Sequence, residues 1–66
     1  MASIGEEYPK QQQRVREILG QYRAIGPAGS FGAAMIEHTL READQAVASG
    51  DVIAMIRSFE AMEAVE

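Results

Sequence analysis

Two helical patterns in this chain are separated by the stretch Gly26-Pro27-Ala28-Gly29-Ser30-Phe31-Gly32. Gly26 stands where a helix can end with a left-handed residue, and Pro27 disfavours the helical conformation in the residue before it. A second break follows at Ser49-Gly50-Asp51, where Gly50 suits a helix end and Asp51 suits the cap of the next helix. The two breaks predict an all-α fold, a helical hairpin plus a third helix, in one small domain over residues 1–66.

The three segments predict helices over about residues 9–25, 30–49 and 52–64, because apolar residues recur in each at helical spacing. We expect the first helix to open at Pro9, where the missing N–H is not needed, after a flexible lead-in over residues 1–7. Ser30 is the expected N-cap of the second helix. Gly20 lies inside the first helix; it either permits a close helix crossing or is a tolerated defect, and we expect the crossing.

The apolar residues also predict which helix faces are buried. The expected buried stripes are Val15, Ile18, Leu19, Tyr22 and Ile25 in the first helix, Ala33, Ile36, Leu40, Ala43 and Val47 in the second, and Val52, Met55, Ile56, Phe59 and Met62 in the third. The second helix carries a further apolar shoulder, made of Phe31, Met35, Thr39 and Ala46. A helix with two apolar faces is wedged between neighbours, one of which can belong to another chain.

The small size of the chain favours self-assembly. A chain of 66 residues buries only about 60% of its unfolded surface. A single core of this size is only marginally stable and usually needs a further stabilising element, such as a disulfide, a metal ion or self-association. The chain contains no cysteine, so a disulfide cannot supply this additional stability. We therefore expect a homo-oligomer, a dimer or larger, with Phe31, Met35 and Ile53 at the interface.

Charge is unevenly distributed and suggests the kind of partner. Four basic and three acidic residues precede position 33, whereas two basic and seven acidic residues follow it. A net charge of −4 disfavours direct DNA binding and suits a partner with a basic face, although acidic helix faces are often only solvated. The expected partner-binding residues are Glu37, Glu42, Asp44, Glu60 and Glu63.

The basic side of the first helix leaves an alternative open. Tyr8, Arg14 and Arg23 could form an anion site, because arginine grips phosphate or carboxylate with two parallel hydrogen bonds. The same arginines could instead pair with the acidic helices of a neighbouring chain.

The sequence contains no pattern typical of catalysis or metal binding. His38 is the only histidine, and with Glu42 it supplies two ligands, whereas a zinc site needs three or four. No nucleophile stands beside a base, and the glycine-rich stretch lacks the Gly-Lys-Ser/Thr end of a phosphate loop. We therefore expect no enzyme, no metal and no cofactor.

The sequence contains no recognisable targeting signal or membrane span. No apolar run approaches the roughly 20 residues of a membrane span, and the first residues lack a signal-peptide pattern. The absence of cysteine fits a reducing compartment. We expect a cytoplasmic protein without a membrane partner.

Three stretches resemble small helical proteins of phages and prophages: Glu7-Tyr8-Pro9-Lys10-Gln11-Gln12-Gln13-Arg14-Val15-Arg16, Ile25-Gly26-Pro27-Ala28-Gly29 and Ser49-Gly50-Asp51. The resemblance implies a non-enzymatic protein that inhibits a host defence complex, a protein or ribonucleoprotein, by stoichiometric binding. In the manner of anti-CRISPR proteins, an acidic surface would face a basic groove. Two alternatives stay open: an oligomeric sponge for a cyclic nucleotide immune signal, and a structural component of phage assembly.

Overall fold

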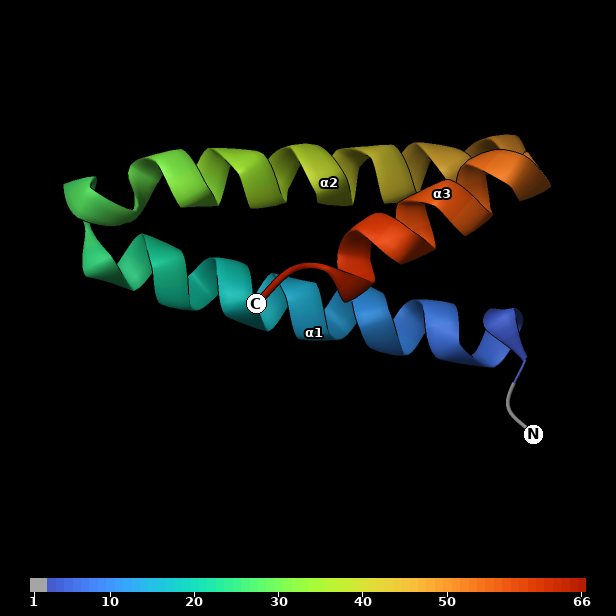
Figure 1. Ribbon diagram of the computed structural model, residues 1–66, viewed down its shortest axis with the longest axis horizontal. Coiled ribbons are helices and arrows are strands. Elements are labelled where there is room, and N and C mark those ends of the chain that lie inside the picture. Colours follow the sequence, from blue (N-terminus) through green and yellow to red (C-terminus); the bar gives the residue numbers. More distant parts are fainter. Residues whose placement is uncertain (1–2) are drawn as a thin grey trace.

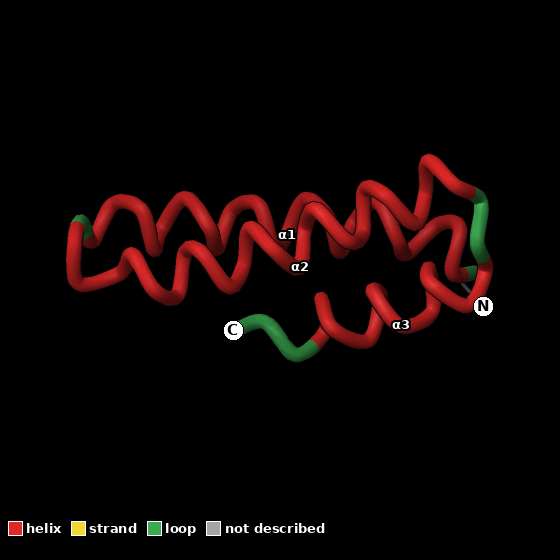
Figure 2. The backbone as a smooth tube through the Cα atoms, turned by 90° about the horizontal axis from the view of Figure 1, so that it is seen from above, coloured by secondary structure: helices red, strands yellow, loops and turns green. Residues whose placement is uncertain are grey.

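The structure, a computed structural model, describes residues 3–66 as three α-helices with no strand among them. α1 spans Ile4–Ile25, a turn of 3-10 helix (η1) spans Pro27–Gly29, α2 spans Ser30–Ser49, and α3 spans Val52–Glu63. α1 and α2 form a long antiparallel hairpin, and α3 folds back obliquely over one face of it (Figures 1 and 2). The predicted all-α fold of a hairpin plus a third helix is confirmed.

The first helix begins earlier than the sequence predicts. Ser3 caps α1 by accepting a hydrogen bond from the Glu6 amide, a pattern with a serine and a glutamate three residues apart that favours helix starts. Residues 4–7 are therefore helical, although a flexible lead-in was predicted over residues 1–7. Residues 1–2 of that predicted segment lie outside the described residues. Pro9 lies inside the helix, where its ring leaves the Gly5 carbonyl without the usual donor.

Glycines make the corner between α1 and α2 tight. Gly26 has φ +87°, a conformation that residues with a β-carbon rarely adopt, so the predicted positive φ is confirmed. A β-carbon on Gly29 would lie 2.3 Å from the Tyr22 carbonyl oxygen, and one on Gly32 would lie 2.5 Å from the Tyr22 ring. Gly29 is required for this close approach because the obstacle there is backbone, whereas at Gly32 the obstacle is the Tyr22 side chain.

Two local predictions are wrong. A β-carbon on Gly20 would meet no atom within 4 Å, so no helix crosses there and this glycine is a tolerated defect. Ser30 is the first residue of α2 rather than its cap; Gly29 precedes the helix and makes no side-chain cap. The turn η1 explains the difference, because the Ser30 amide already donates to the Pro27 carbonyl.

Most of the core lies between α1 and α2. Its buried cluster contains Tyr8, Val15 and Leu19 of α1, Ala33, Ile36, Leu40 and Ala43 of α2, and Met62 of α3. The predicted stripe of α2 is buried except for Val47, which lies in the last turn of the helix and is 48% exposed. Three predicted positions of α1 also differ, since Ile18 and Tyr22 are half-buried and Ile25 is exposed.

The third helix is turned relative to its predicted orientation. Val52 and Ile56 are exposed, although both were expected in the core, and Ser58 is buried. Met62 is buried as expected, and Met55 and Phe59 pack against the core from half-buried positions. The inward face is thus rotated by roughly 60° from the apolar stripe, at 100° per residue.

The helices differ in length, and this difference shapes the surface. α3 has 12 residues, against 20 in α2 and 22 in α1, so it is about 18 Å long whereas α2 is about 30 Å long. α3 starts at the open end of the hairpin and ends midway, short of the corner (Figure 1). The open half therefore has three helices in contact, and the corner half has two.

No helix among residues 3–66 is long and apolar enough to cross a bilayer.

Two glycine substitutions should have opposite effects on stability. Gly20→Ala should raise the free energy of unfolding by about 0.5–1 kcal/mol, because the position is helical and sterically open. Gly29→Ala should lower it by about 1–3 kcal/mol, because the new methyl group overlaps the backbone of Tyr22. Urea titrations of the two variants give the comparison, and the reverse ranking would contradict the tight corner.

Candidate functional site

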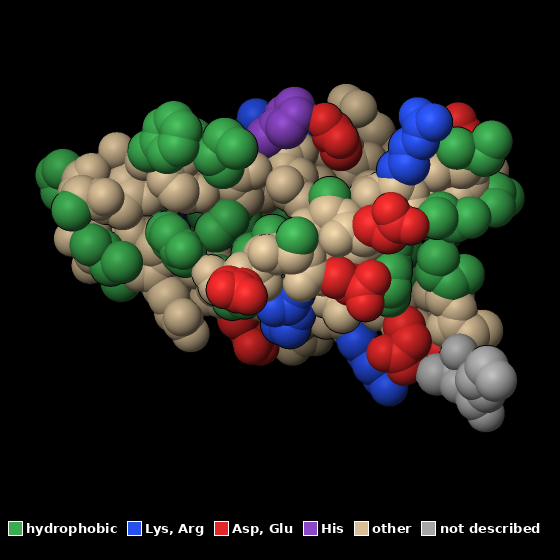
Figure 3. Space-filling model, in the orientation of Figure 1, with side chains coloured by type: hydrophobic (Ala, Val, Ile, Leu, Met, Phe, Trp, Pro, Cys, Tyr) green, Lys and Arg blue, Asp and Glu red, His purple; other side chains and the backbone are tan. Residues whose placement is uncertain are grey.

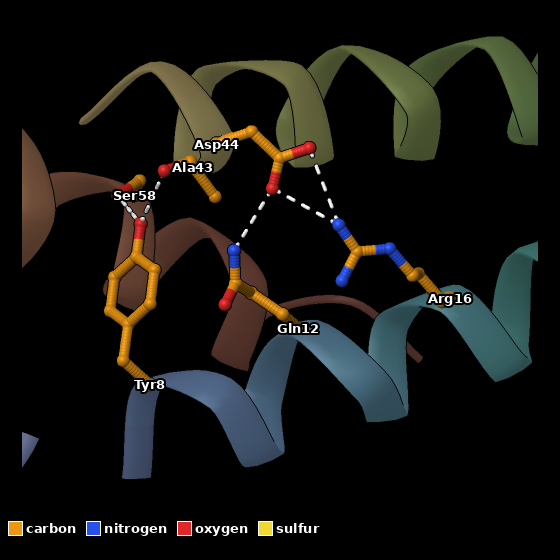
Figure 4. Close-up of polar contacts among 6 residues, drawn as sticks. All are labelled: Tyr8, Gln12, Arg16, Ala43, Asp44 and Ser58. Atoms are coloured by element: carbon orange, nitrogen blue, oxygen red, sulfur yellow. Dashed lines mark hydrogen bonds and ion pairs between the residues drawn. The ribbon is translucent and has the colours of Figure 1, made fainter. Parts of the chain in front are cut away.

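Three of the predicted acidic binding residues are engaged within the chain. Glu37 pairs with Arg23 across the hairpin and lies 3.9 Å from Arg41. Asp44 accepts from Gln12 at 2.9 Å and from Arg16 at 3.1 Å, both on α1 (Figure 4). Glu42 lies 2.6 Å from His38 on the same helix.

These pairs change the electrostatics of the hairpin. Arg16 and Arg23 of α1 meet carboxylates of α2, so acidic and basic groups that look unpaired in the sequence neutralise each other. Exposed pairs of this kind each contribute only about 0–1 kcal/mol to stability. Their main effect is on the surface, because they remove both the acidic face expected on α2 and much of the basic face expected on α1.

The alternative anion site is not assembled. Tyr8 is 2% exposed, and Arg23 is paired with Glu37. Arg14 donates to the carbonyl oxygens of Met62 at 2.6 Å and Val65 at 2.9 Å. These carbonyls belong to the last turn of α3 and the residues after it, where helix ends lack partners and cations are favourable. Arg14 thus holds the end of α3 against α1.

A buried hydroxyl pair joins all three helices. The Tyr8 hydroxyl of α1 lies 2.6 Å from the Ser58 hydroxyl of α3 and donates to the Ala43 carbonyl of α2 at 3.1 Å (Figure 4). The Ser58 hydroxyl has a single hydrogen, which it can donate to the Tyr8 oxygen or to the Met55 carbonyl oxygen at 3.1 Å. No carboxylate or imidazole in residues 3–66 is hydrogen bonded to either hydroxyl, so the pair has no base beside it and its contacts are those of a packing element. Ser58 is 4% exposed and acts as a buried anchor of α3.

The third helix presents the most open candidate surface. Val52, Ile53 and Ile56 expose 66%, 64% and 45% of their surface, and the exposed Glu60 and Glu63 follow on the same side. Neither glutamate forms an ion pair with any residue that the structure describes. We call these five residues the outer face of α3. Figure 3 shows hydrophobic side chains gathered at the end of the molecule where α3 begins, with acidic side chains beside them.

A shallow hollow of about 500 Å³ borders this surface. It lies between α2 and α3, and its lining includes Ile53 and Arg57 from α3 and Gln45 and Ser49 from α2. The hollow gives the apolar part of the outer face a polar margin, as is common at the rims of protein interfaces.

The predicted oligomer interface is divided between two surfaces. Phe31 and Met35 lie near the corner, at the start of α2, and are 79% and 58% exposed. Ile53 lies at the start of α3, at the other end of the hairpin. The three side chains are exposed as expected for contact residues but cannot form one patch.

Comparisons with protein families, with curated proteins and with solved structures found no match to this chain. The resemblance to phage proteins therefore remains a prediction from the sequence.

The sequence analysis did not identify the three residues that anchor α3, Tyr8, Arg14 and Ser58, although the spacing of Tyr8 was informative. Tyr8 precedes Val15 by seven residues and Leu19 by eleven, so it continues the apolar stripe of α1 backwards past Pro9. Together with the cap at Ser3, this spacing indicates a longer helix with Tyr8 inside. The roles of Ser58 and Arg14 depend on contacts across about 50 residues of chain, for which we find no local signal.

Removal of the Tyr8 hydroxyl tests the anchor. Tyr8→Phe should lower the free energy of unfolding by about 1–2 kcal/mol, because Ser58 and the Ala43 carbonyl each lose a buried partner. The double variant Tyr8→Phe/Ser58→Ala should lose less stability than the sum of the losses in the two single variants, because the two hydroxyls share one hydrogen bond. A double-mutant cycle by urea titration makes the measurement; fully additive losses would mean that the two groups act independently.

Proposed function

We propose that this protein is a non-catalytic binding protein that docks on a protein partner through the outer face of α3. The observation that supports this is the combination of three exposed apolar side chains, Val52, Ile53 and Ile56, with two carboxylates that form no ion pair among the described residues. Apolar side chains in the centre and charged groups at the margin are typical of interfaces that form and dissociate.

The charges favour a partner with basic residues. Glu60 and Glu63 carry negative charge without a neighbouring cation within hydrogen-bonding reach in residues 3–66, whereas Glu37 and Asp44 are already paired. A partner surface with an apolar strip flanked by lysine or arginine would bury Ile53 and meet both glutamates. Complementary charge of this kind accelerates association and selects among partners.

More specifically, we propose that the protein is a phage-type inhibitor. It would occupy the basic groove of a host defence complex, a protein or ribonucleoprotein, in the host cytoplasm. The resemblance of the sequence to small phage proteins and the acidic outer face support it. Inhibition would follow from occupancy rather than turnover, so His38→Ala should leave binding nearly intact.

The cyclic nucleotide alternative has less support. Its residues, Tyr8 and Arg14, are already hydrogen bonded inside the bundle, and a ligand would have to displace these contacts. No contact of the described residues favours the assembly alternative over the inhibitor.

Charge reversal on α3 should weaken partner binding. The variant Glu60→Lys/Glu63→Lys should lose most binding, and binding of the unchanged protein should weaken as salt increases, because the contact is partly electrostatic. The tagged protein is first used to capture partners from a bacterial lysate, and affinity for the purified partner is then measured by calorimetry.

A matched control separates the surface from the overall charge. Glu6→Lys/Glu17→Lys changes the net charge by the same amount at exposed positions of α1 and should bind almost normally. Equal losses in both variants, or no loss in the α3 variant, would show that the outer face of α3 is not the docking surface.

A further inference from the structure

A second apolar surface lies at the corner end of the hairpin. Ile25, Phe31 and Met35 are 62%, 79% and 58% exposed, beside the half-buried Ile18 and Tyr22, which pack against the core. We call these five residues the corner face. They adjoin across the hairpin, because the Tyr22 ring lies against Gly32 and the Ile25 side chain lies beside Gly29. Figure 3 shows hydrophobic side chains over this end of the molecule, which α3 does not reach (Figure 1).

The corner face continues the surface that α3 covers elsewhere. Residues 11 positions apart in a helix lie about 20° apart around its axis. Ala46 borders α3 and is 3% exposed, whereas Met35, 11 residues earlier, has no helix over it. On α1, Arg14 reaches the end of α3, whereas Ile25, 11 residues later, is exposed. Both helices thus present apolar side chains to a position that a third helix fills only in the other half.

The corner half of the hairpin is electrically neutral. Residues 18–37 contain two charged side chains, Arg23 and Glu37, and these two pair with each other. The net charge of −4 therefore resides outside this segment of the sequence, and the acidic residue that lies beside the corner face is Glu66, whose carbonyl accepts from the Tyr22 hydroxyl at 3.1 Å. Two copies of an acidic chain repel each other least when they meet at their neutral ends.

The exposed area is in the range that a small dimer needs. With the exposed fractions given above, Ile25, Phe31 and Met35 leave on the order of 350 Å² in water, at roughly 150–200 Å² per large side chain. Two such faces in contact, with their half-buried neighbours and backbone, would bury about 1,000 Å², the lower limit of specific interfaces.

We propose that a second copy of this chain covers the corner face. In a twofold arrangement each hairpin occupies the position that α3 leaves empty on the other, which produces a four-helix bundle at the joined corners. A face without charged side chains is compatible with such self-pairing, since every group meets a copy of its own surroundings. Met35 suits the centre of this contact, because its flexible thioether adapts to a facing side chain.

The dimer would carry two copies of the outer face of α3 at its far ends, because α3 begins at the open end of each hairpin. Two docking surfaces on one particle allow bivalent attachment to a repetitive partner. Self-assembly and partner docking use different residues, so the failure of one does not imply the failure of the other.

Light scattering coupled to size exclusion tests the dimer. We expect the mass to rise from the 7.2 kDa of one chain to twice that value, with a dissociation constant on the order of 10 µM for an interface of this size. Met35→Glu should raise that constant by about tenfold or more, because the charge would be buried in an apolar contact. Circular dichroism should show unchanged helix content, because position 35 is exposed in the single chain.

Ile53→Glu is the matched control, a charge introduced at an equally exposed apolar position on α3, and it should leave the dimer intact. Because the chain has no cysteine, Met35→Cys and Ile53→Cys can each be treated with a short bismaleimide, and the first alone should yield cross-linked dimer. A single-chain mass at all concentrations up to about 1 mM, where a 10 µM dimer would be nearly complete, would overturn the proposal. So would dissociation or cross-linking that follows Ile53 rather than Met35.

Discussion

The surfaces of this protein depend on one constraint, the short length of α3. A helix of 12 residues packs on a hairpin whose arms have 20 and 22, so it completes a three-helix core in the open half alone. The apolar stripe of α1 and the apolar shoulder of α2 nevertheless continue to the corner, where Ile25, Phe31 and Met35 remain in water. The exposed apolar area near the corner is therefore a consequence of the lengths of the elements.

Three hydrogen-bonding side chains, those of Tyr8, Ser58 and Arg14, hold α3 in place. Tyr8 and Ser58 bond to each other in the core, and Arg14 binds the carbonyls at the end of α3. These contacts fix both the position and the rotation of α3. The rotation is what turns Val52, Ile53 and Ile56 outward, so the anchoring of the helix and the composition of its outer face have a common cause.

The sequence predicted the fold where the information was local. Gly26, Gly50 and Asp51 mark helix ends through their own backbone preferences, and the predicted second helix coincides with Ser30–Ser49. The start of α1 was missed because the preference of proline for a first turn was given more weight than the cap at Ser3. The rotation of α3 could not be predicted from its apolar stripe, because a hydrogen bond to Tyr8, 50 residues away, buries a serine in place of an isoleucine. The candidate site was predicted in part, since Ile53, Glu60 and Glu63 were expected as contact residues. The pairing that removes Asp44 from the expected acidic surface could not be predicted, because its partner Arg16 is 28 positions away.

The central claim is that the corner half of the hairpin is incomplete until a second copy covers it. A dilution series of amide and methyl NMR spectra, from about 1 mM to about 10 µM, tests this most directly, because with a dissociation constant on the order of 10 µM the dimeric fraction should fall from nearly all of the chains to about half. Signals of Ile25, Phe31 and Met35 should shift with concentration while those of Val52, Ile53 and Ile56 stay fixed. Spectra that do not change with concentration, or shifts confined to α3, would contradict the claim.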